Sequence, residues 1–339
     1  MAGLSPAEKA LEDKMRSNPI YCPPTCAPAF ERQCIEIREE LDKNYEKIIT
    51  AAIKQAISKS GVTPKIRVET LAKVCEGFLI PQVQKFEGGW GDHPNDSGGP
   101  TMRGVISLTF QGYYNRLFIE WPRLAGLNSI ADKAAALAKN YPGVVGGGGR
   151  GEHVKAALYN FNSSHRVASM FIWGGLCDST TGYPIAVMAA DAWLGYIQFE
   201  MCWGGGPGSV FGSGKAQFDV VAKKYGYTGS PGSPSGWAKW VNNTLDPGKL
   251  PEFAVACFAS QVAFYDRISA SGKNAVFRKG WFNRLINFPT SDLKMCIIIN
   301  EVFNKNTKTM FTFDEKEKQY LDAKAQIYES LTISYPTGG

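Results

Sequence analysis

The stretch Lys85-Phe-Glu-Gly-Gly-Trp-Gly-Asp-His-Pro-Asn-Asp-Ser-Gly-Gly-Pro-Thr-Met-Arg-Gly-Val-Ile106 decides how the rest of the chain is interpreted. Glu87 follows an apolar run, and Asp96 and Thr101 lie on the glycine-rich loop beyond it. Apolar neighbours raise the pKa of a carboxylate, as a general acid near neutral pH requires, while a polar loop keeps a second carboxylate ionised. Glycoside hydrolysis divides its work between two such groups. A helix end followed by a Gly/Asp loop is, however, more often only a loop.

The spacing within this stretch resembles glycoside hydrolase family 108, the secretion-activated muramidases. The shared pattern is Glu-Gly-Gly-aromatic, a turn with Pro, and Asp-x-Gly-Gly-x-Thr-x-x-Gly before an aliphatic residue, here from Glu87 to Val105. Further similar segments bring the resemblance to about residues 71–290: Ala156–Tyr159, Phe171–Trp173, Pro184–Asp191, Phe264–Arg267 and Phe277–Arg284. The resemblance implies a phage-type lysozyme that cleaves the β-1,4 bond between N-acetylmuramic acid and N-acetylglucosamine.

Residue roles follow from the same resemblance. Glu87 takes the position of the catalytic proton donor, and Asp96 and Thr101 are assigned to holding the attacking water or stabilising positive charge. Trp90 is expected either to stack on a sugar ring or to pack as a buried aromatic. The predicted substrate-binding residues are Trp90, Asp92, His93 and Arg103. No metal and no organic cofactor is expected.

Three departures from the family pattern bear on activity. His93 stands where the family usually has Asp before Pro, and Gly91 replaces a common Val. The segment between Ile106 and Pro184 is longer than usual and includes four consecutive glycines, Gly146–Gly149. No Gly-Lys-Ser/Thr follows them, so a flexible surface loop is expected rather than a phosphate site. An inactive descendant of the family is the alternative to an active enzyme.

Composition places the chain among ordinary folded proteins. Of its 339 residues, 44% are hydrophobic and 20% are charged. The net charge of +6 suits an anionic polymer such as the bacterial cell wall, although it also serves solubility alone. No membrane-spanning run and no basic-then-apolar leader is recognised, so synthesis in the host cytoplasm is expected. Neither nucleic acid nor membrane insertion is predicted.

Cysteines and histidines give no clear metal site. Cys22, Cys26 and Cys34 form the only cysteine cluster, which leaves a metal site, a disulfide and buried free thiols open. His153 and His165 lack metal-binding spacing and are expected to be surface or hydrogen-bonded histidines.

The predicted fold class is mainly α, an α+β lysozyme-like module with long helical N- and C-terminal extensions. Apolar residues at helical spacing predict a helix from Phe30 to about Ser60, stopped by Gly61 and Pro64. A second helical stretch covers Val68–Phe86. Thr312 and Glu315 have capping-box spacing, so a last helix is expected near Phe313–Leu331. We predict an N-terminal arm and docking helix at 1–70, a muramidase domain at 71–290 and a helical extension at 291–339.

The expected partners are a peptidoglycan glycan strand and other phage tail or baseplate proteins, which would bind through the terminal helices. This architecture favours a virion-associated lysin that opens the cell wall during phage entry. A free endolysin and a structural tail protein with a degenerate lysozyme fold are the alternatives.

Overall fold

The computed structural model describes residues 23–64, 67–85, 88–92, 99–190, 195–196, 198–199, 201–202, 217–229, 239–241, 243–246 and 249–270. The chain divides into two compact units. The first joins Met1–Ala52 to Ile80–Gly174, and the second joins Ile53–Leu79 to Gly175–Gly339. The predicted boundaries at residues 70 and 290 stay a prediction.

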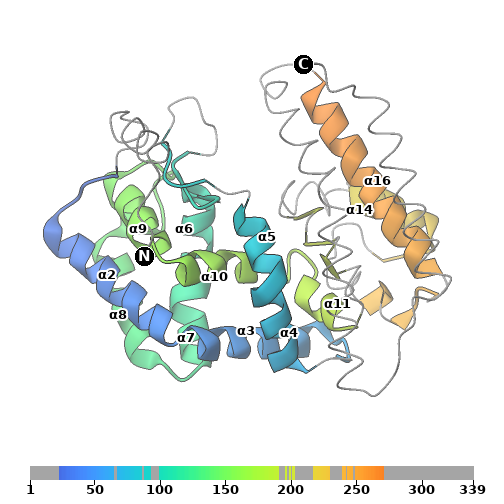
Figure 1. The fold of residues 1–339 in the computed structure, drawn as a ribbon, viewed down its shortest axis with the longest axis horizontal. Coiled ribbons are helices and arrows are strands. Elements are labelled where there is room, and N and C mark those ends of the chain that lie inside the picture. Colours follow the sequence, from blue (N-terminus) through green and yellow to red (C-terminus); the bar gives the residue numbers. More distant parts are fainter. Residues whose placement is uncertain are drawn as a thin grey trace, which may run out of the picture. The chain divides into compact units, whose positions relative to one another are not determined.

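The first unit is built almost entirely of helices (Figure 1), which confirms the mainly α fold class. In chain order its elements are α2 (Pro28–Lys43), the start of α3 (Tyr45–Ser60), α5 (Ile80–Lys85), β1 (Thr101–Met102), β2 (Val105–Ile106), α6 (Ser107–Asn115), the π-helical turn η3 (Arg116–Glu120), α7 (Trp121–Leu124), α8 (Asn128–Asn140), the 3-10 turn η4 (Pro142–Val144), α9 (Glu152–Asn162) and α10 (His165–Leu176).

The predicted N-terminal helix is two helices, because the chain breaks at Asn44 between α2 and α3. Asn44 has φ −106° and ψ 10°, and its side-chain amide donates to the carbonyl of Glu40. Asn competes for backbone hydrogen bonds in this way, which interrupts a helix. The predicted end is confirmed, since α3 stops at Ser60 and Gly61 has φ +69°.

The apolar face of α2 packs within its own unit, against α8 and α9 (Figure 1). The ring of Phe30 lies 4.7 Å from that of Tyr141 and 4.9 Å from that of His153, measured between centroids. Cys34, Ile37 and Leu41 on the same face are also buried. The residues whose periodicity predicted a docking helix therefore serve the core of this unit.

Five aromatic side chains from four helices form the centre of the first unit. They are Phe110 and Tyr114 of α6, Phe118 of η3, Phe161 of α9 and Phe171 of α10, all almost completely buried. Phe110 contacts the other four, with ring centroids 5.8–6.0 Å apart. Burial of this aromatic area stabilises the packing of these four helices against one another.

The predicted helical stretch Val68–Phe86 is confirmed through Lys85, but it is not uniform. It consists of α4 (Val68–Val74), the π-helical turn η2 (Cys75–Leu79) and α5. The boundary between the units falls at the end of η2. A π turn inserts an extra residue into the helical ladder, so the apolar period read from the sequence shifts at this point.

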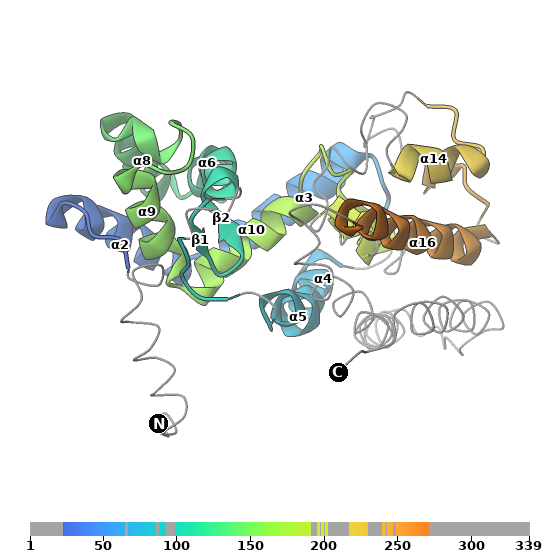
Figure 2. The ribbon, with the colours of Figure 1, turned by 90° about the horizontal axis from the view of Figure 1, so that it is seen from above.

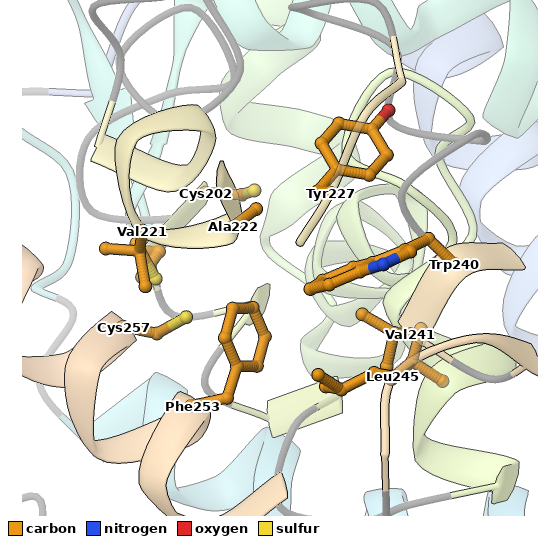
Figure 3. Packing of buried hydrophobic residues seen from close by; sticks show 11 residues of the cluster. Cys202, Val221, Ala222, Tyr227, Trp240, Val241, Leu245, Phe253 and Cys257 are labelled. Atoms are coloured by element: carbon orange, nitrogen blue, oxygen red, sulfur yellow. The ribbon is translucent and has the colours of Figure 1, made fainter. Parts of the chain in front are cut away.

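The second unit contains α4, η2, α11 (Pro184–Ala190), α14 (Gln217–Lys224) and α16 (Leu250–Ser269). Trp240 lies in its core, 5.4 Å from the ring of Tyr227 and 5.5 Å from that of Phe253 (Figure 3). The segment Phe264–Arg267, which is part of the family resemblance, lies within α16. The predicted features at Phe277–Arg284 and Phe313–Leu331 lie outside the described residues. Within the described part of the chain, no helix has the length and apolar character needed to span a membrane.

Candidate active site

A β-hairpin with a two-residue turn carries Thr101 and Arg103. Met102 pairs with Val105 across the antiparallel strands β1 and β2, which leaves Arg103 and Gly104 as the turn. Both turn residues are left-handed, with φ +49° and +77°. This is the pattern of a type I′ turn, whose twist matches that of the two strands. Gly104, at the second position, adopts this conformation without strain. Arg103, at the first position, bears the steric cost of a side chain at positive φ, about 1–2 kcal/mol.

A β-bridge extends this small sheet to Gly91. The amide of Gly91 donates to the carbonyl of Thr101 at 2.9 Å, and the amide of Thr101 donates back at 2.8 Å. The bridge closes the loop whose sequence includes Asp96. The hydroxyl of Thr101 donates to the carbonyl of Gly99 at 3.2 Å. The strands lie beside α9 and α6 (Figure 2).

Three of the predicted site residues, Glu87, His93 and Asp96, lie outside the described residues. Their neighbours along the chain are described on both sides. Helix α5 ends two residues before Glu87, and β1 begins five residues after Asp96. The structure therefore fixes the chain that leads into and out of the predicted catalytic segment.

Trp90 is buried. Its side chain is 7% exposed and meets the ring of Tyr159 edge to face, with 5.8 Å between centroids. Its indole Nε1 has no hydrogen-bond partner. This burial favours the packing alternative over sugar stacking.

Asp92 forms an ion pair with Lys155 of α9. The distance from Lys155 Nζ to Asp92 Oδ2 is 2.5 Å, and both side chains are partly buried. No sequence pattern predicts this pairing, because 63 residues separate the partners. The negative charge that was predicted to contact substrate is thus already balanced by a lysine.

Arg103 reaches the turn between α9 and α10. Its Nε donates to the carbonyl of Asn162 at 3.0 Å, and its Nη1 lies 3.0 Å from His165 Nε2. A guanidinium near terminal helix carbonyls is favourable, because these carbonyls carry partial negative charge. Burial lowers the pKa of Arg103. His165 is exposed, and its pKa is lowered by burial of part of the ring and then by the Arg103 charge. No sequence motif links these two residues, which lie 62 positions apart.

The glycine segment 146–149 is anchored at both of its ends. The side-chain amide of Gln111 donates to the carbonyls of Gly143 and Gly146, at 3.0 and 2.7 Å. Gly149 is buried, and a Cβ there would lie 2.8 Å from the hydroxyl oxygen of Ser107. The expectation of a flexible surface loop missed these contacts, because Gln111 is distant in sequence.

Cys26 and Cys34 are free thiols, so the two are not joined by a disulfide. Cys34 is fully buried, and burial raises its pKa. Cys22 lies outside the described residues. Among the residues that the structure describes, no group of three His, Cys, Asp or Glu side chains could hold a metal ion.

Residues 80–141 match the family model of glycosyl hydrolase 108. This match confirms the resemblance for the segment that contains Glu87, Asp96 and Thr101, which is shorter than the span of about 71–290 predicted from motifs. No curated protein and no solved structure matches the chain. The match supports a glycoside hydrolase, for which peptidoglycan is a fitting substrate.

Proposed function

We propose that the protein is a muramidase that hydrolyses the β-1,4 bond between N-acetylmuramic acid and N-acetylglucosamine in peptidoglycan. The observation that carries this proposal is the glycosyl hydrolase 108 match over residues 80–141, which includes the predicted acid Glu87. The small sheet beyond Glu87 adds support, since the Gly91–Thr101 bridge closes a loop that carries a second carboxylate, Asp96.

In this proposal Glu87 protonates the glycosidic oxygen as the bond to the leaving sugar breaks. Asp96 and Thr101 orient the attacking water or stabilise the oxocarbenium-like transition state. General acid catalysis of this kind contributes about 10²–10⁴-fold to the rate. The reaction consumes one water and needs no oxidant, metal or organic cofactor.

The first experiment is digestion of purified peptidoglycan by the wild-type chain and by Glu87→Gln, with mass spectrometry of the fragments. We expect muramic-acid reducing ends from the wild type and a loss of about 10²-fold or more in the variant. Glu120→Gln is the matched control, because Glu120 lies in the matched segment but is exposed on η3. Equal activity of the two variants would overturn the assignment of Glu87. Absence of fragments from folded wild-type protein would overturn the muramidase.

We further propose that the protein is a tail or baseplate component of a phage particle and opens the cell wall during entry. The support for this role is the length of chain beyond residues 80–141. Tail partners would bind the terminal segments rather than the apolar face of α2, because α8 and α9 pack against that face. Immunoblotting of purified virions tests this role. Detection in the particle supports it, whereas presence only in the lysate favours a free endolysin.

A further inference from the structure

Side chains from two segments that flank the predicted catalytic residues donate hydrogen bonds to the turn that joins α9 to α10. From the hairpin, Arg103 Nε donates to the carbonyl of Asn162 at 3.0 Å. From α5, the side-chain amide of Gln84 donates to the carbonyl of His165 at 3.2 Å. The two acceptors are only three residues apart, so one short turn holds both segments.

These two segments lie on either side of the proposed carboxylates in the sequence. Gln84 precedes Glu87 by three residues, and Arg103 follows Asp96 by seven. Arg103 lies at the tip of the hairpin whose first strand is bridged to Gly91, so a shift of the hairpin would also move Gly91. The spacing of the two carboxylates sets the geometry of glycoside hydrolysis, and a displacement of about 1 Å can cost 10²-fold in rate.

The turn is also held by side chains of α2. Arg38 donates to the hydroxyl of Ser163 at 2.7 Å, and that hydroxyl donates to the carbonyl of Asn160 at 2.8 Å. The hydroxyl of Ser164 donates to a carboxylate oxygen of Asp42 at 2.6 Å. Helix α2 in turn packs against α8 and α9, so the turn is tied to the packed helices of the first unit.

We propose that Arg103 and Gln84 are positioning residues, which fasten the hairpin and α5, the two described segments that flank Glu87 and Asp96 in the sequence, to the turn Asn162–His165. This inference rests on the proposed function. It also gives Arg103 a role other than the predicted substrate contact. The guanidinium bonds offset the backbone cost of a left-handed arginine, for which glycine would otherwise be the better residue.

Arg103→Gly tests the role cleanly, because glycine accepts φ +49° without strain while the guanidinium is removed. Gln84→Met removes the other donor and keeps a good helix former. Each variant is expected to lower kcat about 10-fold or more with KM within about twofold, because misplacement affects the transition state more than binding. The double variant is expected to lose less than the product of the two single losses.

Arg123→Met is the control for charge, since Arg123 is an exposed arginine on α7 that pairs with Asp132. It should leave kcat and KM unchanged. Arg103→Lys retains one donor and should recover part of the loss. A rise in KM with unchanged kcat in Arg103→Gly would instead identify Arg103 as a substrate contact and overturn the proposal.

Hydrogen exchange tests the same link without any need for activity. Arg103→Gly should speed exchange about tenfold in peptides of α5, and Gln84→Met should do so in the hairpin, because each variant releases one end of a shared support. Exchange that changes only around the substituted residue would overturn the positioning role even if the wild type proved inactive. An inactive wild type with the expected exchange would refute the proposed muramidase alone.

Discussion

The ammonium group of Lys155 lies 2.5 Å from a carboxylate oxygen of Asp92, and the two side chains are only 27% and 21% exposed. Asp92 ends the segment that leads into the acidic loop, whereas Lys155 lies on the first turn of α9. The pair therefore ties the start of the loop to a helix whose other end contacts Arg103.

Asp92→Asn is expected to destabilise the first unit by about 1 kcal/mol, because it leaves a partly buried lysine without its countercharge. Lys155→Met should cost a similar amount. Urea unfolding of both variants and of the double variant measures the coupling between the partners. Unchanged stability of Asp92→Asn together with a raised KM for peptidoglycan would show instead that Asp92 serves substrate.

The local parts of this region could be predicted from the sequence, while its long-range contacts could not. The glycine-rich spacing from Glu87 to Gly104 predicts a turn, since left-handed turn positions favour glycine, and it carries the resemblance to glycosyl hydrolase 108. The Arg103 and Gln84 contacts with the α9–α10 turn join residues 59 and 81 positions apart. Periodicity and motif spacing contain no information on which helix end a side chain will reach.

The N-terminal helix shows the same limit. Its amphipathic period was read correctly from Phe30 to Ser60, but the period cannot say what covers the apolar face. In the structure α8 and α9 cover that face of α2. A pattern that predicts an amphipathic helix is thus equally compatible with a docking surface and with an internal core.

Gly149→Ala is expected to destabilise the protein by about 2–3 kcal/mol. Its φ is +79°, and the added Cβ would lie 2.8 Å from Ser107 Oγ and 3.1 Å from Leu108. Gly148→Ala, at φ +82° with open space, should lose only about 1 kcal/mol. Gly151→Ala has neither penalty and should lose less, about 0.5 kcal/mol, because Gly151 is the N-cap of α9, where glycine is preferred over alanine. Thermal unfolding of the three variants ranks them, and equal losses at 148 and 149 would show that the contact with Ser107 is unimportant.

Trp90→Ala should destabilise the first unit by about 3–5 kcal/mol, as expected for a buried aromatic side chain, whereas Trp90→Phe should keep most of the contact with Tyr159. Chemical denaturation measures both losses. If Trp90 instead stacks on a sugar ring, Trp90→Ala would retain its stability and raise KM for peptidoglycan.

Cys26 and Cys34 should differ sharply in reactivity. Cys34 is fully buried with a raised pKa, while Cys26 is partly exposed, and both are free thiols. Because the thiolate is the reactive species, iodoacetamide should label Cys26 in native protein and Cys34 only after unfolding. Peptide mass spectrometry without reductant reads both sites. Cys26 that resists labelling until reductant is added would indicate a disulfide with a cysteine other than Cys34.

His165 should make the stability of the first unit depend on pH in one direction. Its pKa in the folded protein is lowered, first by burial of part of the ring and then by Arg103. The unfolded chain therefore binds the proton more readily, and stability is lost as the pH falls through about 6.5 towards the folded pKa. Above about pH 7.5 both states are neutral and the effect vanishes. The loss should be small because the ring is exposed.

His165→Gln should remove this part of the pH dependence of stability in urea titrations at pH 5 and 8. A wild type equally stable at both pH values would contradict the prediction.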